Sequence, residues 1–101
     1  MTLYLRSKNA DAVAEYNPST RVFIVKKGSR VSPDISHSEK FRGAKTIEKN
    51  REQYVRDGIV IKDATFKSSS TAANFVTGRS TNGLTVWKDK NGISLKMILQ
   101  K

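Results

Sequence analysis

The sequence predicts a single small α+β domain, in which an antiparallel sheet is combined with two helices and a C-terminal β-hairpin. Three observations support this prediction. The first is that 101 residues are enough for one hydrophobic core and too few for two, so we expect one domain over residues 1–101. The second is a composition of 37% hydrophobic and 8% aromatic residues, as in folded domains. The third is that hydrophobic residues alternate near the N-terminus, as in strands, and recur with helical spacing near the middle.

The first third of the chain has the pattern of strands. Leucines alternate with other residues over 3–5, and small or aromatic residues alternate with others over 10–16. Each of these segments is therefore expected to bury one face. Residues 17–19 predict a turn, and the apolar run 22–25 that follows favours an inner strand covered on both faces.

The middle of the chain combines a loop, a helix and a short strand. Residues 32–43 contain Pro33 and several serines without a hydrophobic period, which predicts a loop. Apolar residues recur at helical spacing over 44–55, and Gly58 is expected to form the left-handed cap of that helix. The β-branched run 59–61 predicts a strand after it.

The last third of the chain predicts a second helix and a hairpin. Residues 68–78 have a serine N-cap at one end and a glycine stop at the other, as a two-turn helix does. Residues 84–88 alternate as a strand, and the turn at 89–92 folds the chain back on it to give the C-terminal hairpin. The aliphatic residues within 95–99 predict a final amphipathic turn that closes the core.

A strong excess of positive charge is the most distinctive property of the composition. The chain carries 19 Lys and Arg against nine Asp and Glu, a formal net charge of +10. Both halves of the sequence are equally basic, so the charge belongs to the folded surface rather than to a tail. A basic folded surface predicts a polyanionic partner, and we expect nucleic acid.

The rare residue types exclude several classes of site. The chain has no cysteine, and His37 is its single histidine. Disulfides, thiolate zinc sites, cysteine nucleophiles and paired-histidine metal sites are therefore ruled out, and we expect neither a metal nor a cofactor. The sequence starts without the apolar stretch of a signal peptide and contains no membrane-spanning run, which predicts a cytoplasmic protein with no membrane partner.

The sequence lacks the motifs of the common catalytic sites, which predicts that the protein is not an enzyme. Pro33-Asp34 is half of a common nuclease signature, but no Asp or Glu in the chain is followed two positions later by Lys. For His37, a solvated loop residue is a simpler interpretation than a general base. The glycines form neither a Walker sequence nor the Gly-x-Gly-x-x-Gly of dinucleotide folds.

Nine polar residues are candidates for contacting a nucleic acid. They are Lys26, Lys27, Arg30, Arg42, Lys45, Arg79, Asn82, Lys88 and Lys90. Basic side chains of this kind hold the phosphate backbone by charge and hydrogen bonding. For the basic loop that begins at Lys26, a solvated surface loop is the alternative.

The serines at the start of the second helix are a candidate phosphate site. Ser68, Ser69 and Ser70 would present hydroxyls and free backbone N–H groups at a helix N-terminus, where an anion is stabilised. Neighbouring polar side chains are expected to surround the same anion, namely Lys67, Arg79, Asn82, Lys88 and Lys90. The alternative is that the serines only cap the helix.

Two single residues are open to a structural or a functional interpretation. Arg51 lies on the apolar stripe of the first helix, where a guanidinium needs a partner. Pairing of Arg51 with Asp57 or Asp63 is the simplest expectation. Trp87 is expected in the core, and stacking on a base is the alternative.

Several short stretches of the sequence resemble a known family. They are residues 66–73, 76–83, 86–88 and Gly92, preceded by 22–29, 51–54 and 58–60. Together they resemble the domain of unknown function found at the C-terminus of many GIY-YIG family nucleases, and are similar to the restriction-enzyme adenine-methylase-associated domain. The resemblance spans residues 10–95. Two positions depart from the family pattern, because Ser69 stands where proline is usual and Leu84 where many relatives have an aromatic residue.

The resemblance implies an accessory module associated with DNA restriction, modification or repair, with a nuclease or methylase subunit as its protein partner. Together with the basic charge, it predicts a non-catalytic module that binds the phosphate backbone of a nucleic acid, with DNA favoured and RNA as the open alternative. The alternative is a protein-interaction or structural adaptor with a basic surface. Basic residues gathered on one face would favour nucleic-acid binding, whereas dispersed basic residues beside an exposed apolar patch would favour the adaptor.

Overall fold

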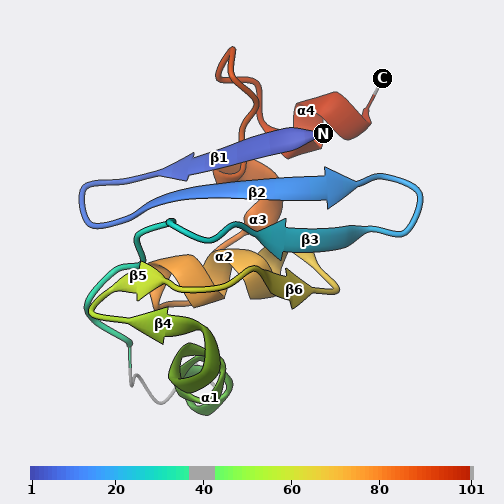
Figure 1. The fold of residues 1–101 in the computed structure, drawn as a ribbon. Coiled ribbons are helices and arrows are strands. Elements are labelled where there is room, and N and C mark those ends of the chain that lie inside the picture. The colour runs from blue at the N-terminus through green and yellow to red at the C-terminus, as the bar shows by residue number, and fades with distance from the viewer. Residues whose placement is uncertain (37–42, 101) are drawn as a thin grey trace.

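The structure, a computed structural model, describes residues 1–36 and 43–100 (Figure 1). Its strands are β1 (Thr2–Arg6), β2 (Asp11–Asn17), β3 (Val22–Val25), β4 (Val55–Arg56), β5 (Ile59–Val60) and β6 (Ala64–Phe66). Its helices are α1 (Ala44–Tyr54), α2 (Ser69–Thr77), α3 (Gly83–Val86) and α4 (Leu95–Leu99). These elements confirm the α+β class.

Four of the strands form one antiparallel sheet in the order β1-β2-β3-β6. The register places Phe23 opposite both Tyr16 and Phe66. Because side chains alternate along a strand, these three residues share one face of the sheet, and all three are buried. The alternation predicted over 3–5 and 10–16 is confirmed in the same way, since the leucines of the first segment and the alternating residues of the second are buried.

The hydrophobic core lies between this sheet and the helices behind it. Figure 1 shows α2 and α3 behind the strands. Trp87, which follows α3, is fully buried, and its ring centroid lies 5.5 Å from that of Phe23. The indole Nε1–H donates to the carbonyl oxygen of Ser69 at 3.0 Å, so the polar atom of the ring has a partner. The prediction that Trp87 belongs to the core is confirmed.

The opposite face of the sheet is open. Val22 and Ile24 on β3 are only half-buried, whereas Phe23 and Val25 on the other face are buried. The prediction that β3 is an inner strand is confirmed. The prediction that it is covered on both faces is wrong, because the described helices lie behind the sheet or near its edges (Figure 1).

A tight hairpin follows α1. The helix ends at Tyr54, and Val55 then pairs with Val60 in the β4–β5 ladder. Asp57 and Gly58 join the two strands, and both have a positive φ, of 54° and 78°. Two consecutive left-handed residues are typical of the type I′ turn, which matches the twist of the strands. Gly58 therefore belongs to the hairpin, and its expected role as the cap of α1 is wrong.

The segment that follows α2 differs from the prediction. The sequence predicts a strand over 84–88, but the first three of these residues belong to α3. Asn82 caps this short helix, because its Oδ1 atom accepts the backbone N–H of Leu84 at 3.0 Å. The expected C-terminal hairpin is reduced to an isolated antiparallel bridge between Lys88 and Ser94. The amphipathic turn predicted for 95–99 is confirmed as α4.

Candidate nucleic-acid interface

A cleft of about 480 Å³ opens between β1 and the segment 85–92. The two walls are joined by the backbone, because Tyr4 and Lys88 exchange N–H···O hydrogen bonds of 2.7 and 2.9 Å. The side chains that give the cleft its chemistry are those of Tyr4, Arg6, Lys88, Asp89 and Lys90. We call these five residues and the space between them the basic cleft.

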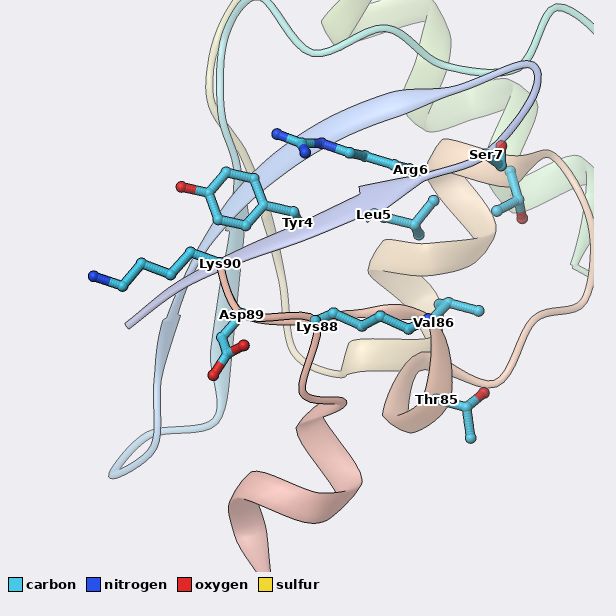
Figure 2. A pocket seen from close by; sticks show the side chains of 11 residues that line it. Tyr4, Leu5, Arg6, Ser7, Thr85, Val86, Lys88, Asp89 and Lys90 are labelled. Carbon is cyan, nitrogen blue, oxygen red and sulfur yellow. The ribbon is translucent and has the colours of Figure 1, made fainter.

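Strand geometry brings an aromatic and a cationic side chain of the basic cleft together, whereas Lys88 extends away from them toward Val86 (Figure 2). Tyr4 and Arg6 are two residues apart on β1 and share a face, with the guanidinium carbon of Arg6 5.1 Å from the centroid of the Tyr4 ring. Figure 2 shows Lys90 extending in the same direction. Arg6 Nε also lies 3.6 Å from a carboxylate oxygen of Asp11, but these side chains are 72% and 55% exposed. An ion pair so open to solvent is weak, and Arg6 can exchange it for a ligand.

Asp89 organises the turn that carries Lys90. Its Oδ1 atom accepts the backbone N–H groups of Asn91 and Ile93, each at 2.9 Å. The backbone N–H of Asp89 in turn donates to the carbonyl oxygen of Ile93 at 2.9 Å. The predicted turn at 89–92 is confirmed, and its carboxylate fixes the position of the neighbouring lysine.

A second hollow, of about 250 Å³, adjoins the basic cleft and shares Ser7 and Thr77 with its walls. It adds Lys8 and Arg79, together with the polar side chains of Asn9, Ser32 and Thr81. We call it the adjoining hollow. Five basic side chains therefore line one continuous surface, and they are Arg6, Lys8, Arg79, Lys88 and Lys90.

The basic loop that contains Lys26, Lys27 and Arg30 does not line this surface. The Nζ atom of Lys26 pairs with Oδ2 of Asp63 at 3.0 Å, and the backbone N–H of Lys27 donates to Oδ1 at 2.9 Å. Arg30 pairs through its backbone with the first residue of β2 and the first residue of β5. Part of the charge of this loop is thus compensated by Asp63.

The contacts of Asp63 with the basic loop should depend on pH, because they favour the ionised form of its carboxyl group. The hydrogen bond from the Lys27 N–H and then that from the Lys26 side chain hold the pKa of Asp63 below its ordinary value. A carboxyl whose pKa is lowered on folding contributes stability above its unfolded pKa, and loses that contribution as the pH falls through its folded pKa. Wild-type protein should therefore lose more stability than Asp63→Asn when acidified below about pH 5, as urea unfolding would measure.

A titration of the Asp63 carboxyl by carbon-detected NMR tests the two contacts separately. We expect Lys26→Met to raise the pKa of Asp63 only part of the way to its ordinary value, because the hydrogen bond from the Lys27 backbone remains. A complete return to the ordinary pKa in this variant would contradict the dominant role of the backbone hydrogen bond.

The other predicted contact residues have different surroundings. Lys45 is exposed in the first turn of α1. Arg42 and His37 lie outside the described residues, so the structure gives no surroundings for them. Asn82 caps α3 with its side chain, which gives it a role in the fold.

The serines at the start of α2 also serve the fold. Ser68 Oγ accepts the N–H of Thr71 at 3.0 Å, so the predicted N-cap is confirmed. The carbonyl oxygen of Ser69 receives the indole N–H from the core. Ser70 Oγ accepts the N–H of Gly83 at 3.2 Å and thereby ties α3 to α2. Capping and tertiary contacts account for the hydroxyls of Ser68 and Ser70.

The cations expected around these serines are divided among different sites. Lys67 lies with the serines in a groove of about 560 Å³, where Arg21 joins it. Lys88 and Lys90 line the basic cleft instead, and Arg79 lines the adjoining hollow. The prediction that all of these cations surround one anion at the serines is therefore wrong, because the segment 85–92 runs beside β1.

Arg51 binds backbone carbonyls rather than the expected carboxylate. Its Nη1 donates to the carbonyl of Ser32 at 2.7 Å, and Nε and Nη2 donate to that of Phe75 at 3.1 and 2.9 Å. A longer bond of 3.3 Å joins Nη2 to the carbonyl of Val76. Burial lowers the pKa of Arg51. The predicted pairing with Asp57 or Asp63 is wrong, because the carbonyls at the C-terminal end of α2 are negative and need donors.

Among residues 1–36 and 43–100, every buried side-chain nitrogen or oxygen has a hydrogen-bond partner. In the same residues, no group of three or more His, Asp or Glu side chains is arranged to hold a metal ion. No helix in this described part of the chain is long and apolar enough to cross a membrane.

Sequence reasoning misses three cations that line these hollows, Arg6, Lys8 and Arg21. Arg6 and Lys8 are far along the chain from the other basic residues of their surface, so no local cluster marks them. The available signal is the alternation that puts Tyr4 and Arg6 on one face of a strand. Arg21 gives no such signal, because it sits in a turn with a φ of 62°, where a side chain other than glycine is uncommon.

Comparison with known proteins identifies the family of the chain. No curated protein and no solved structure matches it. One family model does match, and it covers residues 3–99, which is wider at both ends than the resemblance over 10–95. That model is described as a domain of unknown function, and the chain therefore belongs to the DUF4357 family.

Proposed function

We propose that the protein is a non-catalytic accessory module that binds the phosphate backbone of DNA in the basic cleft and the adjoining hollow. The observation that carries this proposal is the presence of five cations along one continuous surface, namely Arg6, Lys8, Arg79, Lys88 and Lys90. They come from β1, from the loop after it, and from segments that follow α2 and α3.

The chemistry of this surface suits phosphate oxygens. Lys and Arg side chains replace the counterions of a nucleic acid, and hydroxyl and amide groups add hydrogen bonds. Such groups border the cations at Ser7, Asn9 and Thr81. The net charge of +10 adds attraction at longer range, which speeds the encounter with a polyanion.

The resemblance to a C-terminal domain of GIY-YIG nucleases and to the adenine-methylase-associated domain supports a role in DNA restriction, modification or repair. In such a role this module contributes affinity for the DNA backbone, and a nuclease or methylase subunit supplies the chemistry. The basic cleft and the adjoining hollow are suited to this binding role, because contacts with the DNA backbone position a protein without reading the base sequence.

The salt dependence of DNA binding tests the proposal. We expect the full chain to bind a labelled duplex in fluorescence anisotropy with an affinity that falls steeply as salt rises. The double variant Lys88→Gln with Lys90→Gln should weaken binding about tenfold and reduce the slope of log affinity against log salt by about 2, one unit for each lost phosphate contact. Both lysines are exposed, so the fold should be unaffected.

A matched control removes the same charge from another part of the surface. The double variant Lys27→Gln with Arg30→Gln loses two positive charges from the basic loop, outside the basic cleft. We expect it to weaken binding less than the cleft variant does. If the loop variant weakens binding as much or more, the basic cleft is not the binding surface, and if wild-type protein fails to bind at low salt, the proposed function is wrong.

A further inference from the structure

A second groove, whose lining residues differ from those of the basic cleft, lies between the start of α2 and α4. It has a volume of about 560 Å³ and is also bordered by the turn between β2 and β3 and by α3. We call it the α2–α4 groove. We infer that it docks an acidic peptide segment of a partner protein, in which a large aliphatic side chain is flanked by carboxylates.

The floor of the α2–α4 groove is aliphatic and open to solvent. Leu84 of α3 and Leu99 of α4 are 38% and 47% exposed, although both line the groove. Beneath them, Leu95 is buried and continuous with the hydrophobic core. Large apolar side chains that stay exposed within a concave surface are typical of a binding site, because a ligand that covers them removes apolar area from water.

The rim of the groove is positive. Arg21, in the turn between β2 and β3, and Lys67, which precedes α2, both line it and are exposed, and no Asp or Glu is among the described residues that line it. A carboxylate placed beside either cation gains a charge-assisted hydrogen bond that a neutral peptide lacks. Charge complementarity therefore selects an acidic segment, and the aliphatic floor selects a large apolar side chain within it.

The aromatic rings of the groove argue against a nucleic acid as its occupant. Single-stranded nucleic acids stack their bases on exposed aromatic faces. Tyr16 and Phe23 line the groove, but they are only 6% and 0% exposed and pack against each other as tilted rings, 4.6 Å between centroids. The exposed leucines of the groove offer no aromatic face, and aliphatic surface of this kind receives the side chains of a peptide.

Replacement of Arg21 by glycine tests this site without a cost to the fold. Its φ of 62° is left-handed, a conformation that glycine adopts without strain and that a residue with a Cβ resists. Arg21→Gly therefore removes the cation from the rim while leaving the turn at least as stable. A change in binding by this variant reports the lost side chain rather than a loss of folding.

The experiment selects peptides from a random display library on the immobilised full chain and then measures their affinity by fluorescence anisotropy. We expect selected peptides to carry Leu, Ile or Met flanked by Asp or Glu. Arg21→Gly should weaken their binding about fivefold, and Leu99→Ser about tenfold, since each removes one of the two contacts argued above. Lys96→Gln and Met97→Ser are the matched controls, because these residues are exposed on α4 and do not line the groove.

Three results would overturn the inference. They are the selection of no peptide, the selection of peptides without this pattern, and equal binding to wild-type protein and Leu99→Ser. A parallel titration with the labelled DNA duplex separates this inference from the proposed function, because groove variants should leave DNA binding unchanged. If Arg21→Gly instead weakens DNA binding as strongly as peptide binding, the α2–α4 groove belongs to the nucleic-acid surface and the inference is wrong.

Discussion

Replacement of Gly83 by alanine is expected to lower the free energy of unfolding by about 3 kcal/mol. A Cβ at this position would lie 2.2 Å from the carbonyl carbon of Ser69, 2.4 Å from its oxygen and 2.5 Å from the nitrogen of Ser70. These are backbone atoms in the first turn of α2, and the same carbonyl accepts the indole N–H of Trp87. The helices would have to separate, which would disturb the core around the tryptophan.

Urea unfolding followed by the fluorescence of the single tryptophan measures this effect. Gly92→Ala is the control, because Gly92 has a φ of 81° but a Cβ there meets nothing within 4 Å. The control should lose only about 1 kcal/mol, the cost of a left-handed alanine. Equal losses in the two variants would show that α2 and α3 approach each other less closely than described.

Arg51→Met is expected to lower the free energy of unfolding by about 3 kcal/mol, even though the variant keeps an apolar stem of similar length. The guanidinium donates to three backbone carbonyls, those of Ser32, Phe75 and Val76. Without it the carbonyls of Ser32 and Phe75 lose these bonds, in the region where α1, the loop after β3 and the end of α2 meet, whereas the carbonyl of Val76 still accepts the backbone N–H of Ser32 at 2.8 Å. Urea unfolding of the variant measures the loss.

Two further variants identify the source of the effect. Lys49→Met, on the exposed side of α1, should change the free energy of unfolding by less than about 0.5 kcal/mol. Arg51→Lys should recover only part of the loss, because a compact ammonium cannot span carbonyls that a planar guanidinium reaches in several directions. Full recovery with lysine would indicate that charge alone, and not the fork of hydrogen bonds, stabilises this junction.

Elements whose pattern reflects burial could be predicted from the sequence. The alternation at 10–16 identifies β2 because every second residue must face the core. The helical period identifies α1, and a serine cap with a glycine stop identifies α2 at its observed ends. In each case a local rule and the tertiary environment favour the same structure.

Elements decided by partners far along the chain could not be predicted. Residues 84–88 have strand propensity, yet the cap from Asn82 and the close approach of Gly83 to α2 select a short helix. Gly58 follows α1 at the expected distance for a cap, but Val55 is drawn into pairing with Val60. Local propensity is the weaker influence wherever such contacts exist.

The sequence predicts several of the cations of the candidate site, but not which cations lie together on one surface. Lys88, Lys90 and Arg79 are among the expected contact residues and do line the continuous surface. Arg6 and Lys8 complete it from β1 and the loop after it, which no sequence cluster indicates. Proximity in sequence also misleads, since Lys67 is close to Arg79 along the chain and lies in a different groove.

The hydrogen bonds between Tyr4 and Lys88 have a consequence for the order of folding. They join the first strand to a segment near the opposite end of the sequence, and closing so long a loop is entropically costly and slow. We therefore expect the basic cleft to form late in folding. A ligand held across the cleft favours the closed junction, so the amide protons of Tyr4 and Lys88 should exchange with solvent more slowly when it is bound. If the proposed function is correct, binding of DNA in the basic cleft is thus expected only of chains that have completed this junction.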